Sequence, residues 1–169
     1  MNILSPGTPI LYYGNEVGMT GQAGTDLNLR ANMDWNAAAA QAGQPESILN
    51  WCKYLIKARK AYPSLRGGYA TLATDLGPSK VLAYVRDAGA ERVAVVANLT
   101  GLVQTVTLTD LTAHGVAPGA AVGAILGDTK NVGSLNGSKY SVTALPPHAV
   151  RVLLVAGGTF QGTIHGDIQ

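Results

Sequence analysis

The stretch Val81–Leu108, VLAYVRDAGAERVAVVANLTGLVQTVTL, decides the fold of this chain. It contains three short runs rich in Val, Ala, Leu and Thr, which Asp87–Gly89 and Thr100–Gly101 interrupt with turn residues. Branched apolar residues in short runs favour β-strands, and Gly, Asp and Thr between them favour tight reversals. The stretch therefore predicts three consecutive strands joined by short turns.

The same pattern continues on both sides of this stretch. Seven segments between Arg66 and Ala156 are expected to be strands: Tyr69–Thr74, Val81–Arg86, Val93–Leu99, Val103–Leu108, Val122–Leu126, Lys139–Thr143 and Val150–Val155. Seven short strands at this spacing are typical of an antiparallel sandwich or barrel. The fold is predicted to be mainly β, with this domain over residues 66–156.

A helix is predicted before the strands, from about Pro45 to Ala61. One apolar face follows from residues that recur at helical spacing: Ile48, Leu49, Cys52, Leu55 and Ile56. Pro45 suits the first helical turn, where no N–H is needed, and Pro63 ends the helix. Trp51 lies three residues after Ile48 and is expected to pack in the core.

The N-terminal region does not form a hydrophobic unit of its own. A turn at Ser5–Gly7 precedes the apolar run Thr8–Gly14, which suits a strand buried on both faces, as in a parallel sheet. Residues 15–44 are expected to be a loop, in which Ala37–Gly43 is either irregular or a weak helix. The Gly-rich, polar residues 157–169 are expected to form a flexible tail.

Composition argues against several classes of function. The 169 residues include 12 basic and 10 acidic side chains, a net charge of +2 without a basic run. Nothing in this charge distribution favours binding to nucleic acid or to an anionic membrane surface. No apolar run approaches the ~20 residues that span a bilayer, and Met1–Leu4 lacks the basic region of a signal peptide. The sequence does not decide the cellular compartment, although it favours the cytoplasm.

Metal and disulfide chemistry are not expected either. Cys52 is the only cysteine, so an internal disulfide cannot form. His114, His148 and His165 stand far apart, without carboxylates at ligand spacing. We therefore expect neither a metal site nor a cofactor.

Four segments resemble the α-amylase family of glycoside hydrolases. Residues 6–21, PGTPILYYGNEVGMTG, look like the last barrel strand of that family and the loop after it. Residues 26–35, DLNLRANMDW, resemble the D-x-x-x-R-x-x-M-x-W segment of neopullulanases, cyclomaltodextrinases and maltogenic amylases. Residues 49–67 look like the last barrel helix and its exit, and residues 145–154 are similar to the closing strand of the C-terminal sandwich.

This resemblance implies a fold and a function. Residues 1–65 would be a remnant of a (β/α)₈ barrel, with a strand at about 8–14, a loop at 15–44 and a helix at about 45–61. Residues 66–156 would be the family's Greek-key β-sandwich. The family cleaves α-glucosidic bonds with retention, using a nucleophilic and an acid/base carboxylate roughly 5 Å apart. These groups sit at the ends of earlier barrel strands, and their motifs have no counterpart in this chain.

Two residues are implied to contact substrate. In neopullulanase-like enzymes, the residues that match Asp26 and Arg30 contact a glucosyl unit. A charged pair can hydrogen-bond vicinal sugar hydroxyls strongly, and the structural alternative is an exposed ion pair of small energetic effect. Trp35 matches a family position that packs beneath the loop, so we expect it to be buried.

Aromatic platforms for sugar are scarce in the predicted sandwich, which has no Trp. Tyr84 lies in the middle of an apolar run and is expected to be buried. Tyr69 and Tyr140 are therefore the two candidate stacking residues for an α-glucan.

The carboxylates near the expected strand end have two interpretations. Two of Glu16, Asp26 and Asp34 could form a substitute acid/base pair. Alternatively, Glu16 is a structural partner of nearby groups and Asp34 is a loop or turn residue. The second interpretation is favoured, because a working pair needs two differently tuned pKa values held by a rigid shell. We therefore assign no catalytic residue.

The sequence is compatible with three functions, and it does not decide whether the chain is an enzyme. The first is a C-terminal fragment of an α-glucan hydrolase, inactive alone. The second is a free-standing module that binds starch or maltooligosaccharide. The third is a small amylase with an unfamiliar site. A lone parallel strand would leave backbone groups unpaired, so we expect self-association through residues 8–14 or docking of this segment on the sandwich.

Overall fold

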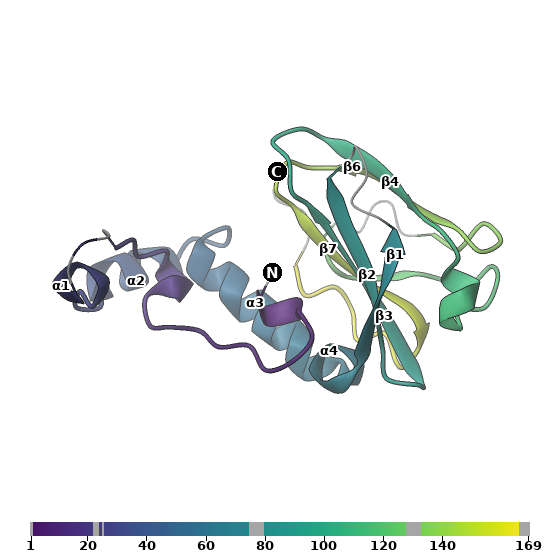
Figure 1. Cartoon of the computed structure of the whole chain (residues 1–169), viewed down its shortest axis with the longest axis horizontal. Helices are drawn as coiled ribbons and strands as arrows, with labels where there is room; N and C mark the ends of the chain where they lie inside the picture. Colours follow the sequence, from purple (N-terminus) through teal and green to yellow (C-terminus); the bar gives the residue numbers. More distant parts are fainter. Residues whose placement is uncertain (1, 22–23, 25, 75–79, 128–132, 166–169) are drawn as a thin grey trace.

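The computed structural model describes residues 2–21, 24, 26–74, 80–127 and 133–165. Figure 1 shows a helical part that projects from one side of a β domain. The helices are η1 (Asn2–Leu4), η2 (Asn15–Val17), α1 (Asp26–Leu29), α2 (Trp35–Ala42), α3 (Ile48–Ala61), α4 (Pro63–Gly67) and η3 (Leu111–His114). We call residues 8–47, which include η2, α1 and α2, the N-terminal arm.

All seven predicted strands are present. They are β1 (Tyr69–Thr74), β2 (Val81–Asp87), β3 (Glu91–Asn98), β4 (Gln104–Leu108), β5 (Gly123–Leu126), β6 (Tyr140–Leu145) and β7 (Val150–Gly157). Five strands form one sheet in the order β1-β2-β3-β7-β5, and β4 pairs with β6 in a second sheet. Every strand pair is antiparallel. The predicted antiparallel sandwich is confirmed.

The central strands of the five-stranded sheet are buried on both faces, which explains why they are apolar at successive positions. On β3, Ala94 and Val96 belong to the core between the two sheets. Val93 and Val95, on the opposite face, belong to a second core that includes Ala58 of α3. Because side chains alternate across a strand, a continuous apolar run fills both cores. Helix α3 therefore covers one face of the sheet, as Figure 1 shows.

The N-terminus of α3 differs from the prediction. The helix begins at Ile48 rather than near Pro45, because the Ser47 side chain acts as the N-cap and accepts a hydrogen bond from the Asn50 amide, at 3.3 Å. The helix ends at Ala61, as predicted, and Pro63 starts the short helix α4.

Two arginines hold the start of the chain against α3 and the sheet. Arg86 on β2 is fully buried and donates hydrogen bonds to the Leu4 carbonyl at 2.8 Å and to the Gly68 carbonyl at 2.9 Å. Arg59 on α3 donates to the carbonyls of Ile3 and Ser5, at 2.7 and 3.0 Å. Burial lowers the pKa of Arg86, and the nearby Arg59 cation acts in the same direction. These contacts fix residues 3–5 before the arm begins.

The strand expected at residues 8–14 is absent, so that prediction was wrong for the chain alone. Residues 8–12 have no regular structure and a turn follows at Tyr13–Gly14. The Ile10 carbonyl accepts a hydrogen bond from the Asn2 side chain rather than from a neighbouring strand, and the Ile10 side chain is 79% exposed. A strand requires a hydrogen-bonded neighbour, and neither sheet formed by the described residues supplies one here.

The tail expected to be flexible has a defined path over part of its length. Residues 158–165 return along β5, and the Ile164 amide donates a hydrogen bond to the Ile125 carbonyl at 2.8 Å. Residues 166–169 lie outside the described residues.

Candidate functional site

The structure brings Asp26 and Arg30 together at the outer end of the arm. Asp26 is the first residue of α1 and Arg30 directly follows its last residue, and Arg30 Nη2 lies 3.5 Å from Asp26 Oδ2. Both side chains are largely exposed, so each keeps donor or acceptor capacity toward solvent. An exposed pair of this kind contributes little to stability, but it can offer charged hydrogen-bonding groups to a sugar.

A small hollow that the sequence did not predict lies beside this pair. It has a volume of about 130 Å³ and is lined by Tyr12, Tyr13, Asn15, Met19, Thr20, Gly21, Leu29 and Ala31. The Tyr12 and Tyr13 rings lie 4.6 Å apart between centroids, and the Tyr13 hydroxyl donates to the Ala31 carbonyl at 3.0 Å. A hydrogen bond with Tyr12 raises the pKa of Tyr13, while the nearby Arg30 acts in the opposite direction. Aromatic rings and a guanidinium therefore lie close together.

The three acidic residues considered as catalytic candidates have different environments. Asp34 is the N-cap of α2, and its Oδ1 accepts a hydrogen bond from the Ala37 amide at 2.8 Å. Asp26 pairs with Arg30. Glu16 is half-buried on η2. Burial raises the pKa of Cys52 on α3, and the Glu16 charge adds to this effect. Two of the three carboxylates therefore have structural partners.

The two tyrosines proposed as stacking platforms differ in exposure. Tyr69, at the start of β1, is 85% exposed and presents its ring to solvent. Tyr140 is only 7% exposed and belongs to the core between the sheets. A stacking platform needs a free ring face, so Tyr140 is not one. Tyr84 is buried, as predicted, in the core beneath α3.

The two tryptophans also differ. Trp51 is half-buried on α3 and packs edge-on against Tyr54, at 5.9 Å between ring centroids. Trp35 was expected to be buried, and this was wrong for the chain alone. It begins α2 and is 74% exposed, because the described residues do not cover this side of the arm.

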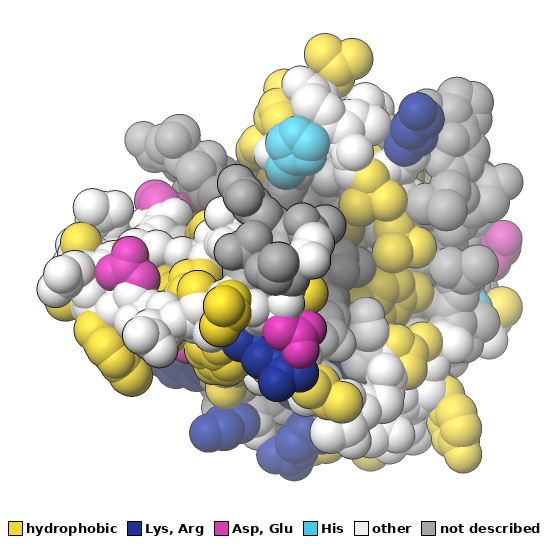
Figure 2. Space-filling model, turned by 60° about the vertical axis from the view of Figure 1, so that its left-hand side comes forward, with side chains coloured by type: hydrophobic (Ala, Val, Ile, Leu, Met, Phe, Trp, Pro, Cys, Tyr) yellow, Lys and Arg dark blue, Asp and Glu magenta, His cyan; other side chains and the backbone are white. Residues whose placement is uncertain are grey.

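Apolar side chains are unusually exposed throughout the arm. The exposed large ones are Ile10, Leu11, Tyr12, Tyr13, Leu27, Leu29 and Trp35. Figure 2 brings this end of the molecule forward and shows hydrophobic side chains at its surface among polar ones. Clustered exposed apolar residues mark surfaces that contact another chain or a ligand.

Two further searches of the described residues gave negative results. Within those ranges, no three His, Cys, Asp or Glu side chains come together in a way that could hold a metal ion. No helix in the described part of the chain is long and apolar enough to cross a bilayer.

Comparison with known proteins agrees with the fold. No protein-family profile matches the chain. It is 36% identical over 103 residues to neopullulanase 2 of Thermoactinomyces vulgaris, a match covering 60% of this chain and 16% of that protein. It is 38% identical over 93 residues to a cyclomaltodextrinase of Geobacillus thermopakistaniensis strain MAS1, covering 54% of this chain and 15% of that protein.

The structural comparison covers more of the chain. The α-amylase of Geobacillus thermoleovorans, solved with acarbose, superposes with a TM-score of 0.68 and 25% identity over 93% of this chain and 32% of that chain. The chain spans 15–16% of the length of the two curated relatives above. The sequence matches and the shared fold together support a partial α-amylase-family fragment, similar in sequence to cyclomaltodextrinases and neopullulanases.

Proposed function

We propose that this chain is the C-terminal portion of an α-glucan-processing glycoside hydrolase and that it does not cleave glycosidic bonds alone. The observation that carries this proposal is the exposed N-terminal arm, in which residues 8–12 have no regular structure and no strand beside them among the described residues. In a complete barrel, neighbouring strands and helices would cover this segment. The arm would then contribute one wall of a substrate cleft built mainly by other residues.

The outer surface of α3 supports the same proposal. Its sheet-facing side carries Tyr54, Leu55 and Ala58, which pack against the core. A second apolar side includes Ile48, which is about half exposed, and Ile56, which lines a hollow of about 210 Å³ with Pro9 and Leu11. A helix with two apolar sides needs two partners. The β domain is one, and the remaining barrel would be the other.

The Asp26–Arg30 pair and the tyrosine hollow would contribute a sugar-binding subsite to the complete enzyme. The support is that Arg30, which pairs with Asp26, is near enough to Tyr13 to oppose the rise in its pKa, and that Tyr13 lines the hollow. The ion pair presents charged hydrogen-bonding groups for hydroxyls, and the Tyr12 and Tyr13 rings provide apolar area for a pyranose. The ligand class proposed is an α-glucan or maltooligosaccharide.

The alternative of a free-standing α-glucan-binding module rests on the exposed ring of Tyr69. It is the weaker candidate, because its intended partner Tyr140 is buried. The third candidate, a small amylase with an unfamiliar site, would need two free and differently tuned carboxylates. Asp26 and Asp34 are already engaged in an ion pair and a helix cap.

One set of assays tests these functions together. The purified chain is incubated with starch, pullulan and cyclodextrin, and reducing sugar is measured. We expect no release above a heat-inactivated control, because a barrel enzyme draws its catalytic groups from several strand ends. Sugar release that disappears in Glu16→Gln or Asp26→Asn would contradict the proposal and favour the third candidate.

Affinity electrophoresis in amylose gels uses the same protein. Retardation that is lost in Arg30→Ala but not in Tyr69→Ala supports the subsite. Loss in Tyr69→Ala alone favours the binding module. Tyr140→Phe serves as the matched control, because it keeps the buried ring.

The exposed run at residues 8–14 also leads us to propose that the isolated chain self-associates through this segment. Its support is that Ile10, Leu11 and Tyr12 are exposed next to one another in sequence. Unpaired extended backbone with apolar side chains is a site of strand pairing between copies.

A further inference from the structure

The chain reverses direction after β7 at two consecutive glycines. Gly157 and Gly158 have φ of +60° and +64°, in the left-handed region that favours glycine. A side chain at Gly157 would overlap the Ala90 carbonyl oxygen, and one at Gly158 would come within 2.8 Å of a Glu91 carboxylate oxygen. The turn therefore depends on both glycines, and it directs residues 159–165 back across the end of the sheet.

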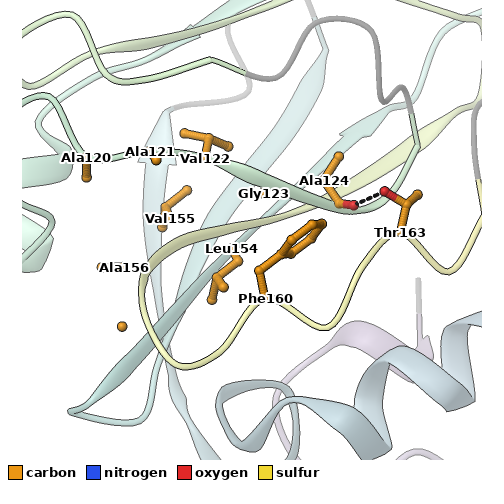
Figure 3. A pocket seen from close by; sticks show the side chains of 11 residues that line it. Ala120, Ala121, Val122, Gly123, Ala124, Leu154, Val155, Ala156, Phe160 and Thr163 are labelled. Carbon is orange, nitrogen blue, oxygen red and sulfur yellow. Dashed lines mark hydrogen bonds between the residues drawn. The ribbon is translucent and has the colours of Figure 1, made fainter.

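Phe160 then lies over the edge strand β5. Figure 3 shows its ring beside Gly123, where it forms one wall of a hollow of about 450 Å³ whose other lining is almost entirely aliphatic. The Phe160 side chain is 45% exposed. A Cβ on Gly123 would lie 2.6 Å from the Phe160 ring, so only glycine leaves room for it. Gly123 and Phe160 are thus complementary in shape, although they stand 37 positions apart in the sequence (160 minus 123).

The next residues extend the sheet beyond β5. The Thr163 hydroxyl donates to the Ala124 carbonyl at 2.8 Å, as drawn in Figure 3. The Ile164 amide donates to the Ile125 carbonyl at 2.8 Å, and the Gly127 amide donates to the His165 carbonyl at 3.0 Å. His165 pairs with Leu126 as a parallel bridge. The segment therefore covers backbone groups at an edge that would otherwise be open to another strand.

His165 also contacts the helical part of the molecule. Its ring stacks on Tyr54 of α3 at 4.4 Å between centroids, with 15° between the planes. It meets the Trp51 ring edge-on at 5.3 Å, and its Nε2 lies 2.7 Å from Glu46 Oε1. Trp51 Nε1 donates to the other Glu46 oxygen at 3.2 Å. One residue at the end of the segment thus connects β5 to α3.

We infer that the β5 edge, with the space above Gly123, forms an acceptor site for an extended Phe-x-x-Thr-Ile-His segment. Residues 160–165 of this chain occupy that site, and by doing so they fasten α3 to the sheet. Phe160 is the apolar anchor, Thr163–His165 supply the strand pairing, and Glu46, Trp51 and Tyr54 receive the histidine. Glu46 is the residue of the arm that takes part in this site, and none of the proposed sugar contacts belongs to it, so the inference stands independently of the proposed function.

The test uses a fluorescent peptide with the sequence of residues 159–165, TFQGTIH, and the full-length chain. In the variant Phe160→Ala/His165→Ala, the internal segment loses its anchor and its contact with α3. Fluorescence anisotropy should show binding of the peptide to this variant. Binding to the unmodified chain should be at least about tenfold weaker, because a site filled in nine molecules of ten is open in only one. A peptide with both residues changed to Ala is the control ligand.

Amide hydrogen exchange provides a second measurement that does not need the peptide. The amides of Gly127 and Ile164 should exchange faster in the double variant, whereas His114→Ala, which removes a histidine elsewhere, should leave them unchanged. Exchange of the segment between two copies would appear as a dimer of the unmodified chain with Gly127 still protected, and would also support the acceptor site. Unchanged exchange in the double variant, or equal peptide affinity for both proteins, would overturn the inference.

Discussion

The β domain and the N-terminal arm differ in how completely they bury their apolar residues. In the sheet, Val95 and Val96 face opposite sides and both are fully buried. In the arm, Leu27 and Trp35 are mostly exposed, and the segment expected to be a strand has none beside it. Some stretches of the arm are as rich in apolar residues as the strands are, so amino-acid composition alone does not distinguish the two regions. The difference shows that the two sheets bury their apolar residues against each other and against α3, whereas the arm leaves large apolar side chains exposed.

The first prediction tests this difference in burial with a matched pair of leucines. Leu108→Ala, at a fully buried position between the sheets, should lower the free energy of unfolding by about 2–5 kcal/mol, because it leaves a cavity. Leu27→Ala, at a position that is 85% exposed, should change it by less than ~0.5 kcal/mol. Urea denaturation followed by circular dichroism measures both. Equal losses would mean that the arm is packed in solution.

The second prediction concerns association of the arm. Ile10→Lys should weaken the self-association of the isolated chain at least about tenfold, a change of ~1.4 kcal/mol, because it places a charge in the exposed run. Sedimentation velocity over a range of concentrations measures the effect. Leu102→Lys, at a similarly exposed site in the β domain, is the control. If the unmodified chain stays monomeric at all concentrations tested, the proposed self-association through residues 8–14 is contradicted.

The third and smallest effect concerns alkaline pH and the β domain. Burial raises the pKa of Tyr84 above its usual value near 10.0. A raised pKa in the folded state gives stability that is present below pH ~10 and is lost as the pH rises further. Tyr84→Phe should remove this loss, which is at most about 1.4 kcal/mol per pH unit. Thermal unfolding at pH 8–11 measures it, and the exposed Tyr69→Phe should behave like the unmodified chain.

The β domain could be predicted from sequence because its signal is local. Residues 93–97 are apolar at every position and include three Val, and both faces of the sheet require apolar residues there. The β-strand expected at residues 8–14 has the same kind of pattern but is absent. Whether such a run pairs depends on a neighbour, which a local pattern does not reveal.

The candidate sites were only partly predictable for the same reason. Asp26 and Arg30 were found through the resemblance of residues 26–35 to a family segment, whereas the short helix α1 that brings them together was expected to be a loop. The histidine contact between Glu46 and His165 joins residues 119 positions apart, and no spacing rule indicates it. Ser47 could have been recognised as the helix cap, since it stands directly before the first residue of α3. The exposure of Tyr69 and the burial of Tyr140 follow from strand register, which depends on the tertiary pairing.

The hydrogen bond from Arg86 to the Leu4 carbonyl also has a consequence for the order of assembly during synthesis. The acceptor leaves the ribosome 82 residues before its donor. Because the ribosome adds ~5–20 residues per second, the Leu4 carbonyl emerges on the order of 4–16 s before Arg86 does. Until β2 has emerged, the hydrogen bonds from Arg59 on α3 to the Ile3 and Ser5 carbonyls can already hold this segment, and Arg86 completes its attachment.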